Sequence, residues 1–332
     1  MHVSKIVLLA LVGLALQGCS ETVPSDHTDP GVDAGINPNA NGTDAGLPNC
    51  QITDPISDLC LLEGLGAQAQ CRTGAFAEGH RWIREAGTTP VIYVQGSAMG
   101  NGSTPDSATS NPTNLIDDQT TSAILVLSKG DHDLQLPSVD HLTIIGACPG
   151  ETTLSITTRG PLSRTQGQSL RLWGLSLANT EQGQAGFGIS ANGAARIEVH
   201  QTIFTQTHRV IDANNVVELS LNSSTIQRTA EVAITVRGPL SSVIVGDNHF
   251  AGPIGGDFAV DIDAVSEATV ESNTFNNIDG AAVGARGALS SVIVGDNHFL
   301  GPISGEGVFL GPISGEGVFR LSGNEFQQIG TD

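Results

Sequence analysis

Four residues near the middle of the chain have side chains that could bind or act on a sugar. Arg171 and Trp173 lie two positions apart, and so do Glu198 and His200 further along the chain. An exposed indole offers a large rigid apolar face to a sugar ring. A glutamate can act as a general acid or base, and a guanidinium can hold an anion. These four are therefore the candidate carbohydrate-contacting residues.

A structural interpretation of the same residues competes with this one, and we favour it. Trp173 could be covered by a loop or by the amino-terminal segment. Arg171 and Glu198 could form an ion pair between neighbouring turns, which typically contributes ~0–1 kcal/mol. On this interpretation the chain has no catalytic residue, and we expect neither a cofactor nor a metal ion.

Two Asp-Asn-His triplets and one pair of aspartates are weaker candidates. The triplets, Asp247–His249 and Asp296–His298, fall two periods of the repeat apart, so ~9–10 Å would separate equivalent atoms. One metal ion cannot bridge that span with ligands at ~2.0–2.2 Å, and duplication explains the repetition better. Asp261 and Asp263 point to one side of a strand and could do glycosidase chemistry. On a solvated strand such a pair is usually only surface.

A repeat determines the elements that must position these residues. Seven segments carry apolar residues at an anchor and at five and seven residues before it. The anchors are Leu177, Phe204, Ile226, Phe250, Phe275, Phe299 and Phe326, spaced 27, 22, 24, 25, 24 and 27 residues apart. A period of this size indicates a repeat architecture, and the alternation before each anchor indicates a strand. The chain predicts an all-β, right-handed, single-stranded parallel β-helix, a solenoid of eight to ten coils stacked ~4.8 Å apart.

Equivalent residues of such a solenoid lie above one another and form columns. Two residues before four successive anchors the chain has an asparagine, which predicts a structural amide ladder of Asn248, Asn273, Asn297 and Asn324. Inward amides are tolerable only when their donors and acceptors are paired. The phenylalanine anchors predict a stacked aromatic column beside this ladder.

A second duplication lies on top of the repeat. Residues 237–257 recur at 286–306 with 17 of 21 positions identical, and the ten-residue segment LGPISGEGVF occurs at 300–309 and again at 310–319. Solenoids accept whole inserted coils because each coil contacts only its neighbours. Since ten residues are not a whole coil, we expect the tandem segment to bulge as a loop, unless it reflects an error in the sequence.

The amino-terminal segment looks like a secretory signal. Residues 1–18 form a short basic start, an apolar run from Ile6 to Leu16, and the sequence Leu-Gln-Gly before Cys19. This ending resembles the bacterial lipoprotein signal, which implies that residues 1–18 are a lipoprotein signal peptide and that Cys19 is lipidated. Ser20 then implies the outer membrane of a Gram-negative cell. Residues 19–49 read as a disordered Gly/Pro/Asn/Asp-rich tether, with a reach of roughly 30 Å.

Residues 50–89 are predicted to form a small helical, cysteine-containing cap before the repeats at 90–332. The helices would span 55–87, turn Trp82 and Ile83 inward and close the open end of the solenoid. An even number of remaining cysteines outside the cytoplasm favours two disulfides in one of three pairings. The candidates are Cys50, Cys60, Cys71 and Cys148.

Charge and the carboxyl end limit the expected partners. A net charge of −20 argues against nucleic acid and anionic polysaccharide. No clear cap follows the last repeat, so its free edge could pair with another protein at the carboxyl-terminal coil.

The first repeats also carry a family resemblance. The order Val91–Val94, Gly100–Ser103, Pro112, Ile124–Leu127 and Leu142–Gly146 resembles the first coils of bacterial pectate-lyase-like β-helix proteins. The enzyme signatures of that class are missing, including Gly-His-Gly and Arg-x-Pro-x-x-Arg. We therefore expect a non-catalytic, lipid-anchored, cell-surface protein that is structural or contacts carbohydrate. A polysaccharide lyase or glycoside hydrolase, and an adhesin or self-assembling spacer, are the alternatives.

Overall fold

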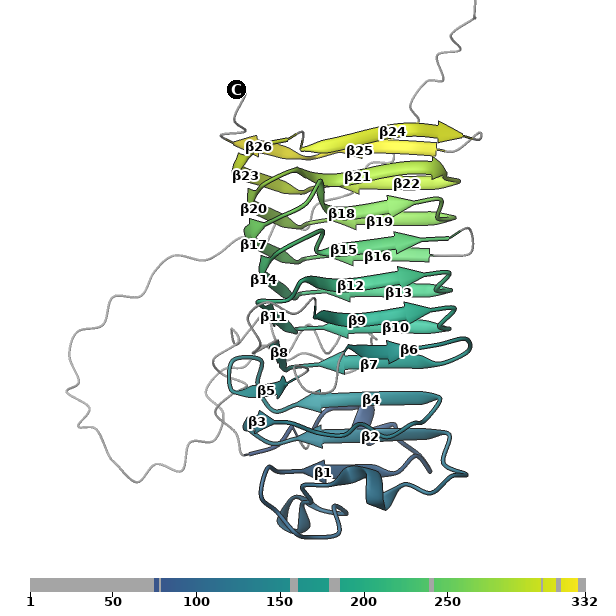
Figure 1. Cartoon of the computed structure of the whole chain (residues 1–332), viewed down its shortest axis with the longest axis vertical. Coiled ribbons are helices and arrows are strands. Elements are labelled where there is room, and N and C mark those ends of the chain that lie inside the picture. The colour runs from purple at the N-terminus through teal and green to yellow at the C-terminus, as the bar shows by residue number, and fades with distance from the viewer. Residues whose placement is uncertain are drawn as a thin grey trace, which may run out of the picture. The chain divides into compact units, whose positions relative to one another are not determined.

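The computed structural model describes residues 75–77, 79–155, 161–178, 186–238, 242–305, 307–314 and 318–327. They form a parallel β-solenoid with three parallel sheets, whose turns stack one above another (Figure 1). The predicted fold class is confirmed at this level. The predicted lipid site Cys19, the tether, and Cys50, Cys60 and Cys71 lie outside the described residues, so lipidation and disulfide pairing stay predictions. Cys148, two residues after the end of a strand, is buried.

Each complete turn contributes one strand to each sheet. Sheet A contains β1 (Val91–Val94), β2 (Ser122–Leu127), β4 (His141–Gly146), β7 (Ser169–Trp173), β10 (Arg196–His200), β13 (Glu218–Asn222), β16 (Ser242–Gly246), β19 (Glu267–Glu271), β22 (Ser291–Gly295) and β25 (Val318–Ser322). Sheet B contains β3 (Gly130–His132), β5 (Thr152–Ser155), β8 (Ser176–Ala178), β11 (Ile203–Thr205), β14 (Thr225–Thr229), β17 (His249–Ile254), β20 (Thr274–Ile278), β23 (His298–Ile303) and β26 (Glu325–Gln327). Sheet C contains β6 (Leu162–Arg164), β9 (Phe187–Asn192), β12 (Arg209–Asn214), β15 (Ile234–Arg237), β18 (Phe258–Asp263), β21 (Ala281–Ala288) and β24 (Val308–Ser314).

Sheet C has the fewest strands. Turns with a strand in all three sheets are therefore fewer than the eight to ten predicted coils. The described part has 10 strands in sheet A, 9 in sheet B and 7 in sheet C. The first turns close with other segments in place of a sheet C strand. The solenoid therefore has about seven complete turns.

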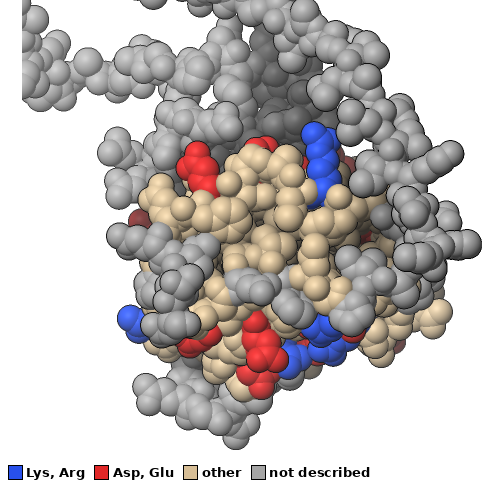
Figure 2. Space-filling view, turned by 90° about the horizontal axis from the view of Figure 1, so that it is seen from above, with Lys and Arg blue, Asp and Glu red and all other residues tan. Residues whose placement is uncertain are grey.

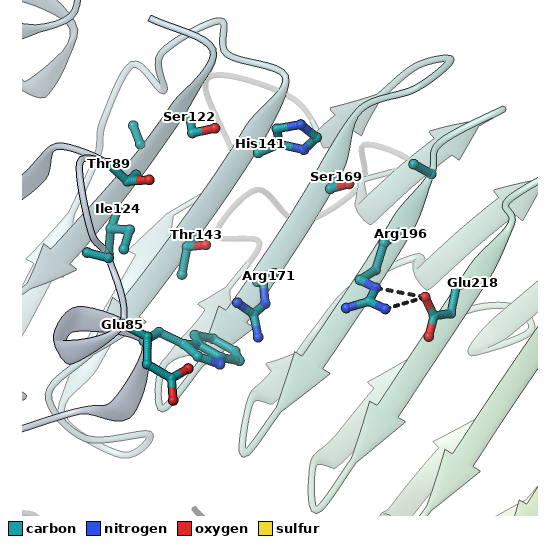
Figure 3. Close-up of a pocket in the computed structure, with 14 residues that line it drawn as sticks. Glu85, Thr89, Ser122, Ile124, His141, Thr143, Ser169, Arg171, Arg196 and Glu218 are labelled. Atoms are coloured by element: carbon teal, nitrogen blue, oxygen red, sulfur yellow. Dashed lines mark hydrogen bonds and ion pairs between the residues drawn. The ribbon is translucent and has the colours of Figure 1, made fainter. Parts of the chain in front are cut away.

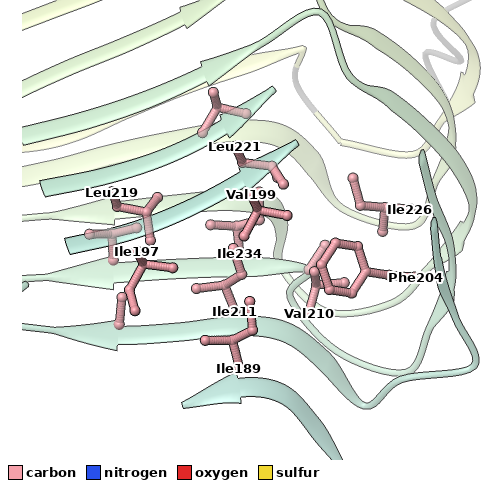
Figure 4. Packing of buried hydrophobic residues seen from close by; sticks show 14 of the residues in the cluster. Ile189, Ile197, Val199, Phe204, Val210, Ile211, Leu219, Leu221, Ile226 and Ile234 are labelled. Atoms are coloured by element: carbon pink, nitrogen blue, oxygen red, sulfur yellow. The ribbon is translucent and has the colours of Figure 1, made fainter. Parts of the chain in front are cut away.

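The core runs through the middle of the solenoid. The apolar positions of the repeat align in register, as in Leu170, Ile197 and Leu219, and their side chains are buried. Figure 4 shows how Ile197, Val199 and their neighbours from sheet A meet Ile211 and Ile234 from sheet C. The predicted inward columns are confirmed.

The corner between sheets A and B has the same backbone conformation in each repeat. Three residues before each anchor the chain adopts a positive φ, between 48° and 68°. The residues are Gly174, Gln201, Ser223, Asp247, Ser272, Asp296 and Gly323. Only glycine adopts this left-handed region without cost, and asparagine and aspartate tolerate it better than most residues. The aspartates of both triplets therefore shape a corner.

The four predicted ladder asparagines form one continuous hydrogen-bonded row. The side-chain amide of Asn273 donates to the carbonyls of Val245 at 2.8 Å and Glu271 at 2.9 Å, and to Oδ1 of Asn297 at 3.0 Å. Its own Oδ1 accepts the backbone N–H of Asn248 at 2.9 Å. Asn248 and Asn297 repeat most of this pattern, so the buried amides are paired as their burial requires.

The aromatic anchors stack beside this row. The rings of Phe250 and Phe275 are 4.6 Å apart at 14°, those of Phe275 and Phe299 are 5.2 Å apart at 7°, and those of Phe299 and Phe326 are 4.7 Å apart at 7°. The first three rings are fully buried, whereas Phe326 is exposed. The amide row and the ring stack together fix the spacing between neighbouring turns at the corner between sheets A and B.

The expectation that the tandem ten-residue segment bulges as a loop is wrong for its described residues. Leu300 of the first copy pairs with Asn276 in sheet B, and Leu310 of the second copy pairs with Ala285 in sheet C. The second copy then continues into β25 of sheet A, where Val318 pairs with Ser291. The duplicated residues thus complete an ordinary turn, because they supply the strands that the turn needs.

The first strand is covered by a loop. The backbone N–H of Tyr93 in β1 donates to the carbonyl of Gly102 at 2.8 Å, and Thr109 donates to the carbonyl of Tyr93 at 3.0 Å. This loop includes the short helix η1 (Pro105–Ser107), and η2 (Pro112–Leu115) follows. The free edge of β1 is therefore satisfied by the segment that leads to β2.

Replacing Asn273 by alanine should destabilise the solenoid, because it leaves the buried backbone N–H of Asn248 without its acceptor. The cost should be on the order of 3 kcal/mol of unfolding free energy. Urea unfolding followed by circular dichroism measures it. Asn222→Ala is the control, because Asn222 lies on the outer face and donates to Ser220 at 2.6 Å. Equal losses in the two variants would contradict a special role for the row.

Candidate functional site

A four-residue helix lies on the outer face of sheet A. This helix, α3 (Arg81–Arg84), buries Trp82 together with Phe76 against outward side chains of the early strands. Those side chains are Ile124, Val126, Ile145 and Trp173. The predicted inward position of Trp82 is confirmed, but α3 covers a face of the solenoid, where we had expected a helix to close its end. The physical reason is that the first strands carry apolar residues on both faces.

The site begins where this cover ends. A groove of about 560 Å³ runs between α3 and the outer face of β2, β4, β7, β10 and β13 (Figure 3). Along one row its floor presents Ser122, His141, Ser169, Arg196 and Glu218, which are in register on neighbouring strands. Trp82 and Glu85 belong to the opposite wall. The groove is therefore long, mostly polar and open across successive strands.

Charged residues in and beside the groove are paired with one another. Nε of Arg171 lies 2.8 Å from Oε2 of Glu198, and Nε2 of His200 lies 3.1 Å from Oε1 of the same carboxylate. Arg196 binds Glu218 at 2.6 Å. The guanidinium of Arg171 also lies 4.0 Å from the ring centre of Trp82, a cation–π contact that ties the helix to the sheet.

These contacts determine the ionisation of Glu198. Burial by itself raises the pKa of Glu198, but hydrogen bonds from His200 and Arg171 and the Arg171 charge outweigh it and lower the pKa to about 2. A carboxylate with this pKa holds no proton to donate at neutral pH and is a weak base. Glu198 is therefore suited to holding Arg171 and His200 in place.

His80 lies in the covered part of the interface. Its ring centre is 4.3 Å from that of Trp173 and 5.0 Å from that of Trp82, and its Nδ1 accepts the backbone N–H of Trp82 at 3.2 Å. Burial, with a smaller contribution from the positive charge of Arg171, lowers the pKa of His80 to about 3. The neutral ring caps the first turn of α3.

The structure brings the four sequence candidates together but leaves only part of the set accessible. Trp173 faces outward from the sheet as the register predicts, yet it is only 7% exposed because the helix segment covers it. Its face is therefore not a free platform for a sugar. Arg171 lines the groove, whereas Glu198 and His200 lie beside it and are hydrogen-bonded to each other. The cross-turn pairing of Arg171 and Glu198 agrees with the structural interpretation.

The groove residues that sequence reasoning missed share one repeat position. Ser169, Arg196 and Glu218 lie eight residues before their anchors. Arg171 and Glu198 lie six residues before theirs, so extending the same outward alternation by one step indicates this row. His141 and Thr143 lie before the first anchored segment, so the repeat template could not indicate them.

The weaker candidates have structural surroundings. Asn248 and Asn297 of the triplets belong to the amide row, and His298 pairs with Glu325 at 3.1 Å. Asp261 is buried, contrary to the expectation of a solvated strand, and accepts a hydrogen bond from Arg286 at 2.8 Å. Burial raises the pKa of Asp261, and the charge of Arg286 partly offsets this. Within the described ranges no group of three or more His, Cys, Asp or Glu side chains could hold a metal ion.

No family model, no curated protein and no solved structure matches the chain. Among the described residues, no helix has the length and apolar character needed to cross a membrane.

Acidification should loosen the helix from sheet A. The pKa of His80 is lower in the folded state, about 3 against 6.5, so its contribution to stability is full above pH 6.5 and is lost as the pH falls toward 3. The loss should be on the order of 2 kcal/mol by pH 5. Both tryptophans of the chain, Trp82 and Trp173, lie here, so intrinsic fluorescence should shift to the red between pH 7.5 and 5.

The variant His80→Asn keeps a capping side chain but cannot take up a proton, so its fluorescence should not shift over this range. His141→Gln, at the exposed end of β4, is the matched control and should behave as the wild type. The stabilising contribution of Glu198 is full above pH 4.5 and is lost only below it, because its folded pKa is about 2, so it stays constant in this window. An unchanged shift in His80→Asn would contradict the assignment.

Proposed function

We propose that this chain is a non-catalytic surface lipoprotein whose groove on sheet A holds a neutral, extended polysaccharide. The observation that carries the proposal is the groove itself, an open channel of about 560 Å³ whose floor presents hydroxyl, imidazole and ion-paired groups across five neighbouring strands. The surface-anchoring part of the proposal rests on the signal-like residues 1–18 and on Cys19.

The chemistry of the floor favours an uncharged glycan. Ser122, Thr143 and Ser169 offer hydroxyl groups, and His141 offers an imidazole, all of which can exchange hydrogen bonds with sugar hydroxyls. The guanidinium of Arg196 is already bound to Glu218, so it adds little free positive charge. A chain with a net charge of −20 would also repel an acidic polymer.

A catalytic role is less well supported by the same geometry. A lyase or hydrolase needs a positioned acid or base with a suitable pKa. Glu198 is held ionised with a pKa of about 2, and Glu218 is bound by Arg196 at 2.6 Å. Both carboxylates therefore already have cationic partners.

A blocking substitution tests the groove. Ser169 and Ser242 occupy the same position of their turns, three strands apart in the aligned row, but only Ser169 lines the groove. Ser169→Trp should lower retention on a neutral polysaccharide, such as xylan or mixed-linkage glucan, at least tenfold. Ser242→Trp adds the same side chain outside the groove and should retain the polymer as the wild type does.

Affinity electrophoresis measures retention, and a reducing-sugar assay on the same samples measures cleavage. Retention without products, lost only in Ser169→Trp, is the expected result. Release of products by the wild type would instead favour the lyase or hydrolase alternative. Equal retention by both variants, or none by the wild type, would rule out the groove as the binding surface.

A self-assembling spacer is the second candidate, favoured by the last described turn. Leu310, Leu321 and Phe326 occupy core positions of the repeat and are 42%, 51% and 52% exposed. Figure 2 looks onto this turn, and the described atoms at its centre are neither acidic nor basic. A second copy offers matching strand edges and apolar residues, so Leu321→Asp should abolish any dimer seen by light scattering.

A further inference from the structure

A second cavity lies away from the groove, at the end of sheet C that is nearer the amino terminus. It measures about 400 Å³ and lies between β5, β6 and the segment 134–138 that joins β3 to β4. β6 is the end strand of sheet C, so the solenoid wall continues below it with this irregular segment and not with a strand. The cavity lies where the strand β6 of sheet C meets the irregular segment 134–138.

One charged residue of this cavity does not fit its position in the repeat. Arg164 of β6 is in register with Ala191, and the same column continues through Ala213, Val236 and Ile262. Its neighbours in the column are thus small or apolar residues of the core. Arg164 is only 8% exposed, which is unusual for arginine.

Only one of the three guanidinium nitrogens of Arg164 has a hydrogen-bond partner among the described residues. Nη1 donates to the carbonyl of Ser163 at 2.9 Å. Nε and Nη2 are buried and have no hydrogen-bond partner. These two nitrogens form the side-on fork with which arginine binds a carboxylate through two parallel hydrogen bonds.

Leaving this fork unpaired is costly. A buried charge without partners is destabilising, and a native structure normally supplies a counter-ion or hydrogen-bond acceptors. Burial lowers the pKa of Arg164 to about 10, so the side chain still carries its charge at neutral pH. A group that satisfies the fork would therefore carry a negative charge.

The remaining walls indicate what kind of anion would fit. Leu134, Leu136, Pro137, Leu154 and Leu162 contribute apolar surface, and Gln135 and three serines contribute polar surface of similar extent. A pocket of this size with both kinds of surface suits a small organic molecule that has a polar group and an apolar body. A bare inorganic ion would leave most of this surface in contact with water.

We propose that the cavity between β6 and residues 134–138 binds a small organic monocarboxylate, with its carboxylate on the Nε/Nη2 fork of Arg164 and its apolar body against the leucines. The site is independent of the polysaccharide groove, which lies on sheet A. A single cation in a chain of net charge −20 suits one negative charge better than several.

Isothermal titration of the full chain with three probes tests the proposal. Octanoate has both the charge and the apolar body, acetate has only the charge, and 1-octanol has only the apolar body. Octanoate should bind, and the other two should bind at least tenfold more weakly. Equal affinity for acetate would overturn the apolar half of the proposal, and equal affinity for octanol would overturn the role of the carboxylate.

Variants locate the binding. Arg164→Met should weaken octanoate binding at least tenfold, and Arg164→Lys should lose part of it because an ammonium lacks the fork. Arg237→Met removes an exposed arginine of the same sheet and should change nothing. Leu136→Trp should block binding by filling the cavity while Arg164 is kept. Octanoate binding that persists unchanged in Arg164→Met, or is absent from the wild type, would overturn the proposal.

A ligand-free measurement separates binding from folding. If Arg164 is an unpaired buried cation, Arg164→Met should unfold in urea at the wild-type midpoint or above it. A clearly lower midpoint would show that the guanidinium already has structural partners, and this too would overturn the proposal.

Discussion

The hydrogen bonds at the corner between sheets A and B are the constraint on which the rest of the solenoid depends. At this corner the backbone leaves one sheet and has not yet entered the next, and the N–H groups of the row residues, such as Asn248, are not bonded within the strand ladders. The asparagine Oδ1 atoms of the following turn accept them, as Asn273 does for Asn248 at 2.9 Å. A slip of one residue would place these amides in the apolar core and lose their partners. Each turn is thereby held in register with the next.

Because the corner between sheets A and B is constant, differences in the number of residues per turn are confined to the rest of the turn. The residues from seven before the anchor to the anchor itself keep their spacing in every repeat, although the anchors are 22 to 27 residues apart. Differences in length therefore fall between the anchor and the next sheet A strand. Part of the difference falls within the strands themselves, as the register shifts between Gln227 and Thr229 of β14 and between Ala285 and Gly287 of β21 show, whereas the anchored corner stays constant.

The same arrangement explains why a groove exists on only one part of sheet A. The early strands have apolar outward side chains, such as Ile124 and Val126, and these require cover from Trp82 and its neighbours. Where the cover meets the polar row of Ser169 and Arg196, a channel remains. Ile244, further along the sheet, is 45% exposed and lies outside this channel. The position of the site thus follows from which outward residues are apolar.

Sequence reasoning reached sheets A and B because their residues keep fixed offsets. The strands of sheet C could not be predicted in this way, because their distance from the anchor varies. Ile211 follows its anchor Phe204 by seven residues, whereas Val260 follows Phe250 by ten. The left-handed corner was also missed, because Gly, Gln, Ser and Asp at one position share no obvious chemical property. Trp173 was correctly placed on the outer face, and its cover by the amino-terminal segment, the interpretation favoured from the sequence, agrees with its contacts. Which residues of that segment cover it, Phe76 and Trp82, could not be read from a local pattern because they lie far away in sequence.

The tandem ten-residue segment shows how far local sequence determines structure in this chain. Two identical copies follow each other, yet Leu300 pairs in sheet B and Leu310 pairs in sheet C. Intrinsic preference cannot distinguish them, because their sequences are the same. The two leucines differ in their distance from the anchored corner. Leu300 directly follows the anchor Phe299, whereas Leu310 comes eleven residues after Phe299. The sheet that a segment joins therefore depends on its position in the turn, that is, on the number of residues that separate it from the corner with the amide row.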